Sequence, residues 1–272
     1  MSIKFPDIIV KSESSGIPTW ADATFDQIRI LLLMHDRGEI NIYDYWSVGD
    51  KKDVELGVIE NWTTPGGNTF YGFNSSQILT WELMDTSYAN NSNIHFVVGT
   101  EDCLNSPREF HLDEYDPTSP WIYGWHNSNI RTWLNSSFKN ALPAGFLKLF
   151  KQMTIKSATG ATIQDGEHTT TTVTTVNDYF ALFAAKEVTN SALGYYSIAE
   201  ENAVLSKVQG LSGYKNVNGT RRSWWLRSMA DYARKTWMSD TGHIPMYCNG
   251  NPNVDVPSIP TIPRGIAPFG CI

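Results

Sequence analysis

Two apolar stretches near the end of the chain decide how it folds: Ser223–Ser228 (SWWLRS) and Gly265–Ile272 (GIAPFGCI). Chain ends are usually polar and frayed, so an apolar end predicts a final strand that is locked into the core. The first stretch has the aromatic composition of a strand. Between them, residues 229–264 form an irregular stretch that is interrupted by Gly, by Asn and by five prolines. We expect an exposed recognition loop there, clamped at both ends by rigid structure.

The composition of the 272-residue chain is that of a globular protein with few charges and many aromatic rings. Hydrophobic residues make up 41%, charged residues 18% and aromatic residues 12%. This profile is typical of extracellular or virion β proteins and of antibody-like binding surfaces, and equally of any loop-rich β protein. The formal net charge of -7 argues against binding to nucleic-acid phosphates, so we expect no nucleic-acid partner.

One stretch departs from this acidic balance. Residues 221–235 contain one acidic side chain, Asp231, against five basic ones: Arg221, Arg222, Arg227, Arg234 and Lys235. The stretch is either a solvated basic face or a patch for an anionic ligand, such as a phosphate-bearing cell-wall polymer.

The cysteines and the hydropathy pattern indicate where the protein is made. Cys103, Cys248 and Cys271 cannot all pair within one chain, and none belongs to a C-x-x-C motif. We expect small buried thiols formed in a reducing cytosol. No stretch matches a secretory signal or a membrane span. The sequence therefore predicts synthesis in a host cytoplasm without a signal peptide, and no insertion into a membrane.

The N-terminal part divides into an arm and a docking region. Residues 1–19 carry a short apolar piece that cannot bury itself alone, so this arm should dock on the body or on a partner chain. Thr24 and Gln27 form a capping-box pattern that predicts a helix ending near Gly38. Two short strands around a turn at 49–52 should follow, which makes residues 20–57 a helix-plus-strand docking region.

The body, residues 58–272, mixes strands with a few helices. Apolar spacing predicts a helix over Asn129–Leu142, capped by Ser128 and stopped by Pro143. Thr169–Thr175 fits either a strand or an exposed hairpin. We expect an α+β fold with mixed or antiparallel sheets. Further helices are expected at 144–151 and 198–208, and further strands at 78–84, 94–98, 153–157 and 243–248.

Motifs of the common enzyme classes are absent. The densest acidic cluster contains Glu109, Asp113 and Asp116, which are weak candidates for a calcium site or for the acid/base pair of a glycosidase. Nearby prolines favour an inert surface loop instead. His243 and Cys248, five residues apart on a possible strand, would lie on opposite faces and so are not expected to form a catalytic pair. We therefore expect no catalytic residue, no cofactor and no metal.

Four ordered motifs resemble a bacterial and prophage domain family of unknown function. Members share a W-W-L-R-S strand, as at Trp224–Ser228, and end near G-V-x-P-x-x-C-I, as at Gly265–Ile272. Ser128–Asn135 is similar to the family's S-x-[IL]-R-x-W-L-N helix, and Ala141–Pro143 to the A-L-P that ends it. Residues 24–52 resemble the N-terminal half of prophage tail-associated members.

This resemblance implies a C-type-lectin-like domain. The family is distantly similar to the variable proteins of diversity-generating retroelements and to the formylglycine-generating-enzyme fold. Such proteins keep the tryptophan strand and the closing strand constant and vary exposed side chains between them. The paired cysteines of the enzymes in that fold group have no counterpart here, so the resemblance does not imply enzymatic activity.

Side chains along the predicted strand at 224–227 alternate between two faces, which helps to separate structural residues from candidate surface residues. Trp224 and Leu226 share one face of their strand, and Trp225 and Arg227 share the other. The second face either presents an anion-binding surface or is also internal, with Arg227 satisfied by carbonyls or by an acid within the fold. We assign the frame to Trp224, Trp225, Leu226, Arg227, Phe269 and Ile272. The candidate ligand-binding residues are the aromatic, arginine and asparagine side chains that make adaptable contacts: Tyr232, Arg234, Trp237, Tyr247, Asn249, Asn251 and Asn253.

Together these features predict a non-enzymatic phage or prophage virion protein, such as a tail, baseplate or head-fibre adhesin. Its C-terminal lectin-like domain would bind a host surface glycan or protein, and its N-terminal end would attach it to other virion subunits, in a homo-oligomer. The alternative is a structural or decoration protein of the virion that contacts only neighbouring subunits. A glycan hydrolase is a third reading.

Overall fold

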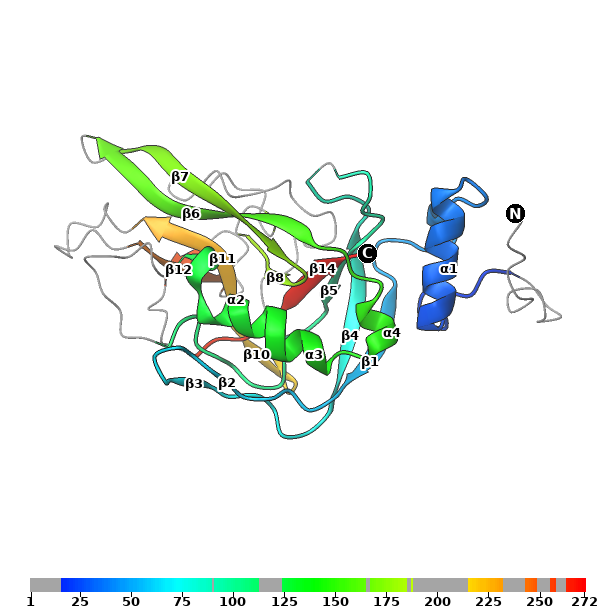
Figure 1. Cartoon of the computed structure of the whole chain (residues 1–272), viewed down its shortest axis with the longest axis horizontal. Coiled ribbons are helices and arrows are strands. Elements are labelled where there is room, and N and C mark those ends of the chain that lie inside the picture. The colour runs from blue at the N-terminus through cyan, green and yellow to red at the C-terminus, as the bar shows by residue number, and fades with distance from the viewer. Residues whose placement is uncertain are drawn as a thin grey trace.

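The computed structural model describes residues 16–89, 91–112, 124–164, 167–184, 187, 215–231, 243–248, 255–257 and 263–272. The fold is mixed α+β, with few helices and with strand ladders that pair antiparallel (Figure 1). The coarse fold class predicted from the sequence is therefore confirmed. Within the described ranges, no helix combines the length and the hydropathy needed to traverse a lipid bilayer.

A five-stranded antiparallel sheet organises the body, and the last strand of the chain lies inside it. β14 pairs with β5 on one side and with β8 on the other, and all four of its residues are buried. The predicted closing strand is thus confirmed. The strand order is β1 (Lys51–Leu56), β4 (Gln77–Asp85), β5 (Val97–Thr100), β14 (Pro268–Cys271) and β8 (Ala181–Leu182).

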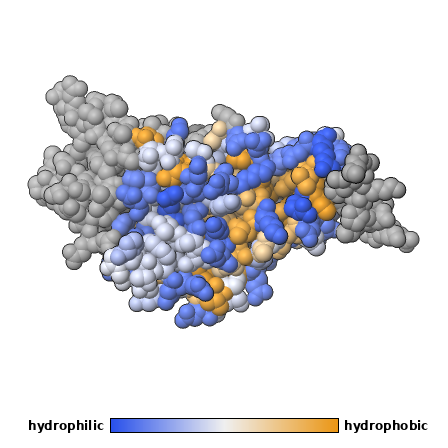
Figure 2. Space-filling view, viewed as in Figure 1, coloured by the Kyte–Doolittle hydropathy of each residue, from blue (hydrophilic) through white to orange (hydrophobic). Residues whose placement is uncertain are grey.

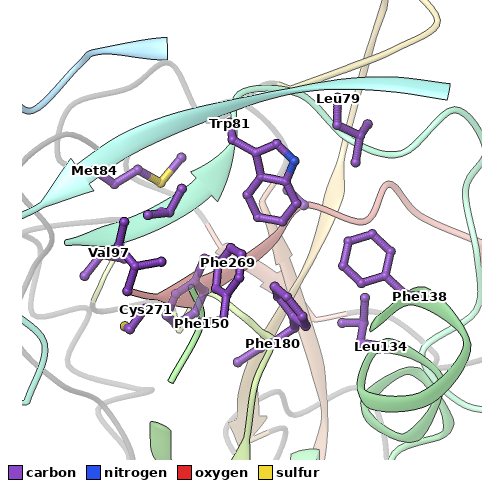
Figure 3. Packing of buried hydrophobic residues seen from close by; sticks show 14 of the residues in the cluster. Leu79, Trp81, Met84, Val97, Leu134, Phe138, Phe150, Phe180, Phe269 and Cys271 are labelled. Carbon is purple, nitrogen blue, oxygen red and sulfur yellow. The ribbon is translucent and has the colours of Figure 1, made fainter. Parts of the chain in front are cut away.

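Aromatic side chains fill the space between this sheet and the helices (Figure 3). The ring of Trp81, from β4, lies 5.7 Å from that of Phe150, and Phe150 lies 4.8 Å from Phe180. Phe138 reaches the same cluster from the helical side, with its ring centroid 5.4 Å from that of Phe180. Such tilted and edge-on pairs stabilise the core beyond the area that they bury.

The N-terminal helix α1 (Phe25–Asp36) begins as its sequence predicts. Thr24 Oγ1 accepts a hydrogen bond from Gln27 N, and Thr24 N donates one to Gln27 Oε1, so both halves of the capping box are present. One predicted strand is wrong, because residues 45–48 form no strand. The 3-10 turn η1 (Ile42–Asp44) leads instead into a turn at Gly49, whose φ of 103° favours glycine.

The predicted helix at 129–142 is confirmed in extent but not in regularity. Ser128 caps α2 (Asn129–Trp133), as expected, by accepting a hydrogen bond from Arg131 N. The helix then widens into a π-helical turn, η4 (Leu134–Phe138), and ends with α3 (Lys139–Ala141). Pro143 stops it and precedes the short α4 (Ala144–Leu147).

Two further strand groups complete the fold. β6 (Met153–Gln164) and β7 (Glu167–Asp178) pair in a long hairpin, and the Thr-rich run at 169–175 lies in β7. β11 (Trp224–Asp231), β12 (His243–Cys248) and β13 (Asp255–Pro257) form a three-stranded antiparallel sheet. β12 confirms the strand expected at 243–248, which lies within the segment predicted as a recognition loop. The smaller elements are β2 (Trp62–Thr63), β3 (Thr69–Phe70), η3 (Trp125–Asn127), β9 (Lys215–Val217) and β10 (Thr220–Arg222).

Several sequence predictions fall outside the described residues. These are the apolar part of the N-terminal arm and the helix at 198–208. The domain boundary predicted at residue 57 lies between β1 and β4 along the chain. All six residues of β1 nevertheless pair with β4 in one sheet. Among the described residues, one cluster of buried hydrophobic side chains has members from Trp20 to Ile272.

We expect Gly270→Ala to destabilise the protein by about 1–3 kcal/mol, because it overpacks the centre of the sheet. A Cβ atom at this position would lie 2.6 Å from Phe150 Cδ1 and 2.8 Å from Tyr179 O. Urea denaturation measures the change in free energy of unfolding. Gly57→Ala is the matched control, because its nearest neighbour, Ala141 O, is 3.5 Å away. Equal stability of the two variants would contradict this account of β14.

A histidine lies at the junction between α1 and the sheet. His95 is almost fully buried, its Nε2 is 3.0 Å from Asp36 Oδ1, and its ring lies 5.2 Å from that of His35. The pKa of His95 is lowered by burial and then by the nearby Lys151 and His35, against the opposing effect of Asp36. Protonation of His95 is therefore disfavoured in the folded protein.

Acid should destabilise the fold through His95. A folded-state pKa below the usual value of about 6.5 means that the unfolded state takes up the proton first, so the free energy of unfolding falls as the pH falls through that value. Urea denaturation at neutral pH and under mild acid measures this loss, and His95→Gln should make it smaller. A loss in His95→Gln as large as in the wild type would contradict the prediction.

Candidate ligand-binding surface

The first half of β11 is enclosed on both faces. Trp225 N donates a hydrogen bond to Gly265 O, and Arg227 N donates one to Phe183 O, so the strand joins the segment before β14 to the end of β8. Each side chain of Trp224, Trp225, Leu226 and Arg227 is at most 1% exposed. Alternation along this strand therefore separates two buried faces, and not a core face from a solvent face.

The two tryptophans make different internal contacts. Trp225 Nε1 donates a hydrogen bond to Arg108 O at 2.8 Å, and its ring meets that of Phe110 edge-on at 5.4 Å. Trp224 meets Phe183 edge-on, at 5.7 Å between ring centroids. Neither ring is available to stack on a ligand.

Arg227 forms a two-pronged ion pair with Glu187 in the interior. Its Nη1 and Nη2 atoms each donate a hydrogen bond of 2.6 Å to one carboxylate oxygen, and Nη1 also donates to Leu182 O. Tyr88 OH donates to the same carboxylate at 3.1 Å, and burial raises the pKa of Tyr88 well above its usual value. Of the two alternatives for Arg227, the structure shows the internal one.

The helix motif is used internally in the same way. Arg131 binds the buried Asp178 through Nε and Nη2, at 2.8–3.0 Å, and Trp125 Nε1 donates to Asp178 as well. Asn135 lies in the π-helical turn, where its Oδ1 accepts from Tyr179 N and Phe180 N. The motif side chains thus tie α2 and η4 to the turn between β7 and β8.

The strand register divides the predicted ligand-binding residues into two groups. Asp231 pairs with His243 at one end of β12, and Cys248 pairs with Asp255 at the other end. The six residues of β12 separate these ends by about 17 Å. Tyr232, Arg234 and Trp237 belong to the connection that leaves at the first end, and Asn249, Asn251 and Asn253 to the connection that leaves at the second.

Tyr247 is the one predicted ligand-binding residue within the described ranges. It lies in β12, with Trp225 and Val256 as its partners in the ladder. The other six lie outside those ranges. What the structure fixes is therefore where their connections start and end.

The end of β11 points away from α1. Figure 1 shows the β6–β7 hairpin and β11 extending toward one end of the molecule, while α1 lies at the opposite end. The connection from 232 to 242 leaves β11 and enters β12 at the first of these ends. The described part of this end therefore consists of the last residue of β11, Asp231, and its partner His243 at the start of β12.

The structure gives little support to the remaining candidate sites. Glu109 is half-buried beside Arg108, while Asp113 and Asp116 lie outside the described residues. In the described part of the chain, no group of three or more His, Cys, Asp or Glu side chains could hold a metal ion. Arg227, one of the five basic residues in 221–235, is buried and so does not contribute to a basic surface. Cys103 and Cys271 are buried thiols, as expected.

Comparison with known proteins places this architecture in a family. The family model described as a domain of unknown function, DUF6273, matches residues 108–253, more than half of the chain. The chain belongs to this DUF6273 family. No curated protein and no solved structure matches it. The resemblance to an uncharacterised family is confirmed at this level.

The DUF6273 region contains both internal motifs, Ser128–Asn135 and Trp224–Ser228. Their partners are the residues that sequence reasoning missed, namely Asp178, Glu187 and Tyr88. The one available signal was an arginine inside an apolar strand, which requires a buried acid or carbonyls. That signal does not say which acid.

We expect Arg227→Met to destabilise the protein by about 3–5 kcal/mol, because it leaves the Glu187 carboxylate buried without its counter-charge. The double variant with Glu187→Met should recover much of this loss, since it removes both charges. Chemical denaturation measures the three free energies of unfolding. Arg29→Met is the control, because Arg29 is exposed on α1. A single variant as stable as this control would contradict the role given to the ion pair.

Proposed function

We propose that this protein is a non-enzymatic adhesin of a phage or prophage virion, which binds a host surface glycan or protein. The observation that carries the proposal is the internal use of the motif side chains. Because Trp224, Trp225 and Arg227 are buried and bonded within the fold, they frame a binding surface and do not form one. The variable chemistry then belongs to the connections that leave β11 and β12.

A C-type-lectin-like arrangement of the domain is part of this proposal. Two features support it: a closing strand inside an antiparallel sheet, and a tryptophan-bearing strand joined to the segment just before it. In such domains, loops between constant strands carry recognition. The end that bears α1 would attach the protein to the particle or to sister subunits.

Of the two groups of candidate residues, we assign ligand binding to Tyr232, Arg234 and Trp237. Aromatic and arginine side chains dominate binding energies at recognition surfaces, because they bury large areas and donate several hydrogen bonds. Asparagine contributes adaptable polar contacts, which are individually weaker. The two groups leave opposite ends of β12, so substitutions can test them separately.

We expect the purified protein to bind polysaccharides or surface proteins from the envelope of its host cell. Trp237→Ala and Arg234→Ala should each weaken binding at least about tenfold, as loss of a hot-spot residue does. Asn251→Ala and Asn253→Ala are matched controls at the opposite end of β12, and they should bind like the wild type. Glycan arrays and surface plasmon resonance measure the affinities, and near-ultraviolet circular dichroism verifies folding.

Two outcomes would redirect this proposal. Absence of binding to any envelope component, with binding to purified virion subunits instead, would indicate the structural or decoration protein. Loss of binding in the asparagine variants alone would move the site to the other end of β12.

A further inference from the structure

The outward face of α1 carries a regular stripe of four side chains. Successive residues turn by about 100° around a helix, so side chains alternately four and three residues apart share one face. The buried face of α1 consists of Ile28, Leu31 and Leu32. On the opposite face lie, in chain order, Asp26, Ile30, Leu33 and Arg37.

This stripe is apolar in its centre and charged at its ends. Leu33 is 36% exposed although it is a large aliphatic residue, and the neighbouring Ile30 is half-buried. Asp26 and Arg37 are both exposed. The spacing of four, three and four residues is that of a coiled-coil seam, in which one helix packs along another. Figure 2 shows apolar surface in the part of the molecule where α1 lies in Figure 1.

We propose that α1 pairs antiparallel with α1 of a second copy of this chain, across a two-fold axis between Ile30 and Leu33. Such an axis places Ile30 against Leu33 of the second copy, and Leu33 against Ile30 of the second copy. The same register places Asp26 opposite Arg37 of the second copy, once at each end. The stripe is therefore self-complementary, as a two-fold interface between identical surfaces must be.

Charge decides both the occupant and the direction. A parallel pair would place Asp26 against Asp26 and Arg37 against Arg37, whereas the antiparallel pair joins opposite charges and opposes the two helix dipoles. Each of these charges takes part in an exposed ion pair within its own copy. Arg29 lies 3.8 Å from Asp26 and Glu39 lies 3.9 Å from Arg37, and such exposed pairs contribute little to stability. These two ion pairs can be exchanged for pairs across the two-fold axis.

The inference deepens the homo-oligomer expected of the proposed adhesin, but it rests on α1 alone. Its failure would leave ligand binding at the other end of the molecule untouched. A contact through one helix pair is smaller than a standard protein interface of about 1,600 Å². We therefore expect dimers with a dissociation constant in the micromolar range.

Sedimentation velocity of the full chain over a range of concentrations tests this. The wild type should dimerise, and Leu33→Glu should be monomeric at every concentration. Ile78→Glu is the matched control, because Ile78 is an exposed aliphatic residue on β4, 66% exposed, and that variant should dimerise like the wild type. Circular dichroism verifies that the variants are folded. A monomeric wild type, or a dimeric Leu33→Glu, would overturn the proposal.

Charge exchange tests the register. Asp26→Arg and Arg37→Asp should each weaken dimerisation at least about tenfold, because each places like charges together at both ends. An equimolar mixture of the two should form heterodimers, and the double variant should dimerise again, because both restore opposite charges. A double variant as weak as the single ones would overturn the antiparallel pairing, since only a parallel pair keeps like charges together in it.

Discussion

The ion pair between Arg227 and Glu187 is the interaction on which the rest of the body depends. Both side chains are fully buried, so each charge has lost the water that would otherwise stabilise it. That cost is offset only when the hydrogen-bonding capacity of both groups is met at once. Leu182 O and Tyr88 OH supply further bonds. The pair therefore fixes β11, β8 and the chain beside Tyr88 in one arrangement. Any other arrangement would leave an uncompensated charge in the low-dielectric interior, at a high cost in free energy.

The same logic explains the helix motif at Ser128–Asn135 of this chain. Arg131 is held by Asp178, and Asn135 satisfies the backbone of the turn at 179–180. The π-helical turn at 134–138 contains Asn135 and places it against this turn. π-helical turns often accompany functional sites, but here the inserted turn serves internal bonding. The arginine and tryptophan side chains by which these motifs are recognised thus hold the fold together from the inside.

Local features of the structure were accessible from the sequence because their partners are close along the chain. The capping box at Thr24, the cap at Ser128 and the stop at Pro143 are examples. The strand at 268–271 was also predictable, because an apolar run of this kind indicates a buried segment. Long-range partners were not. Nothing near Glu187 marks it as the acid for Arg227. Nor does the sequence show that Trp46 Nε1 donates to the distant Pro18 O, in a segment at 45–48 that forms no strand.

The register of β12 has a consequence for how this protein can vary. Substitutions more than about 7–10 Å apart usually act additively. The connections at 232–242 and 249–254 start from opposite ends of one strand, whose position is fixed by ladders on both sides. Substitutions at His243 and at Cys248, the two ends of β12, should therefore act additively. The two ends of this strand can vary independently of each other.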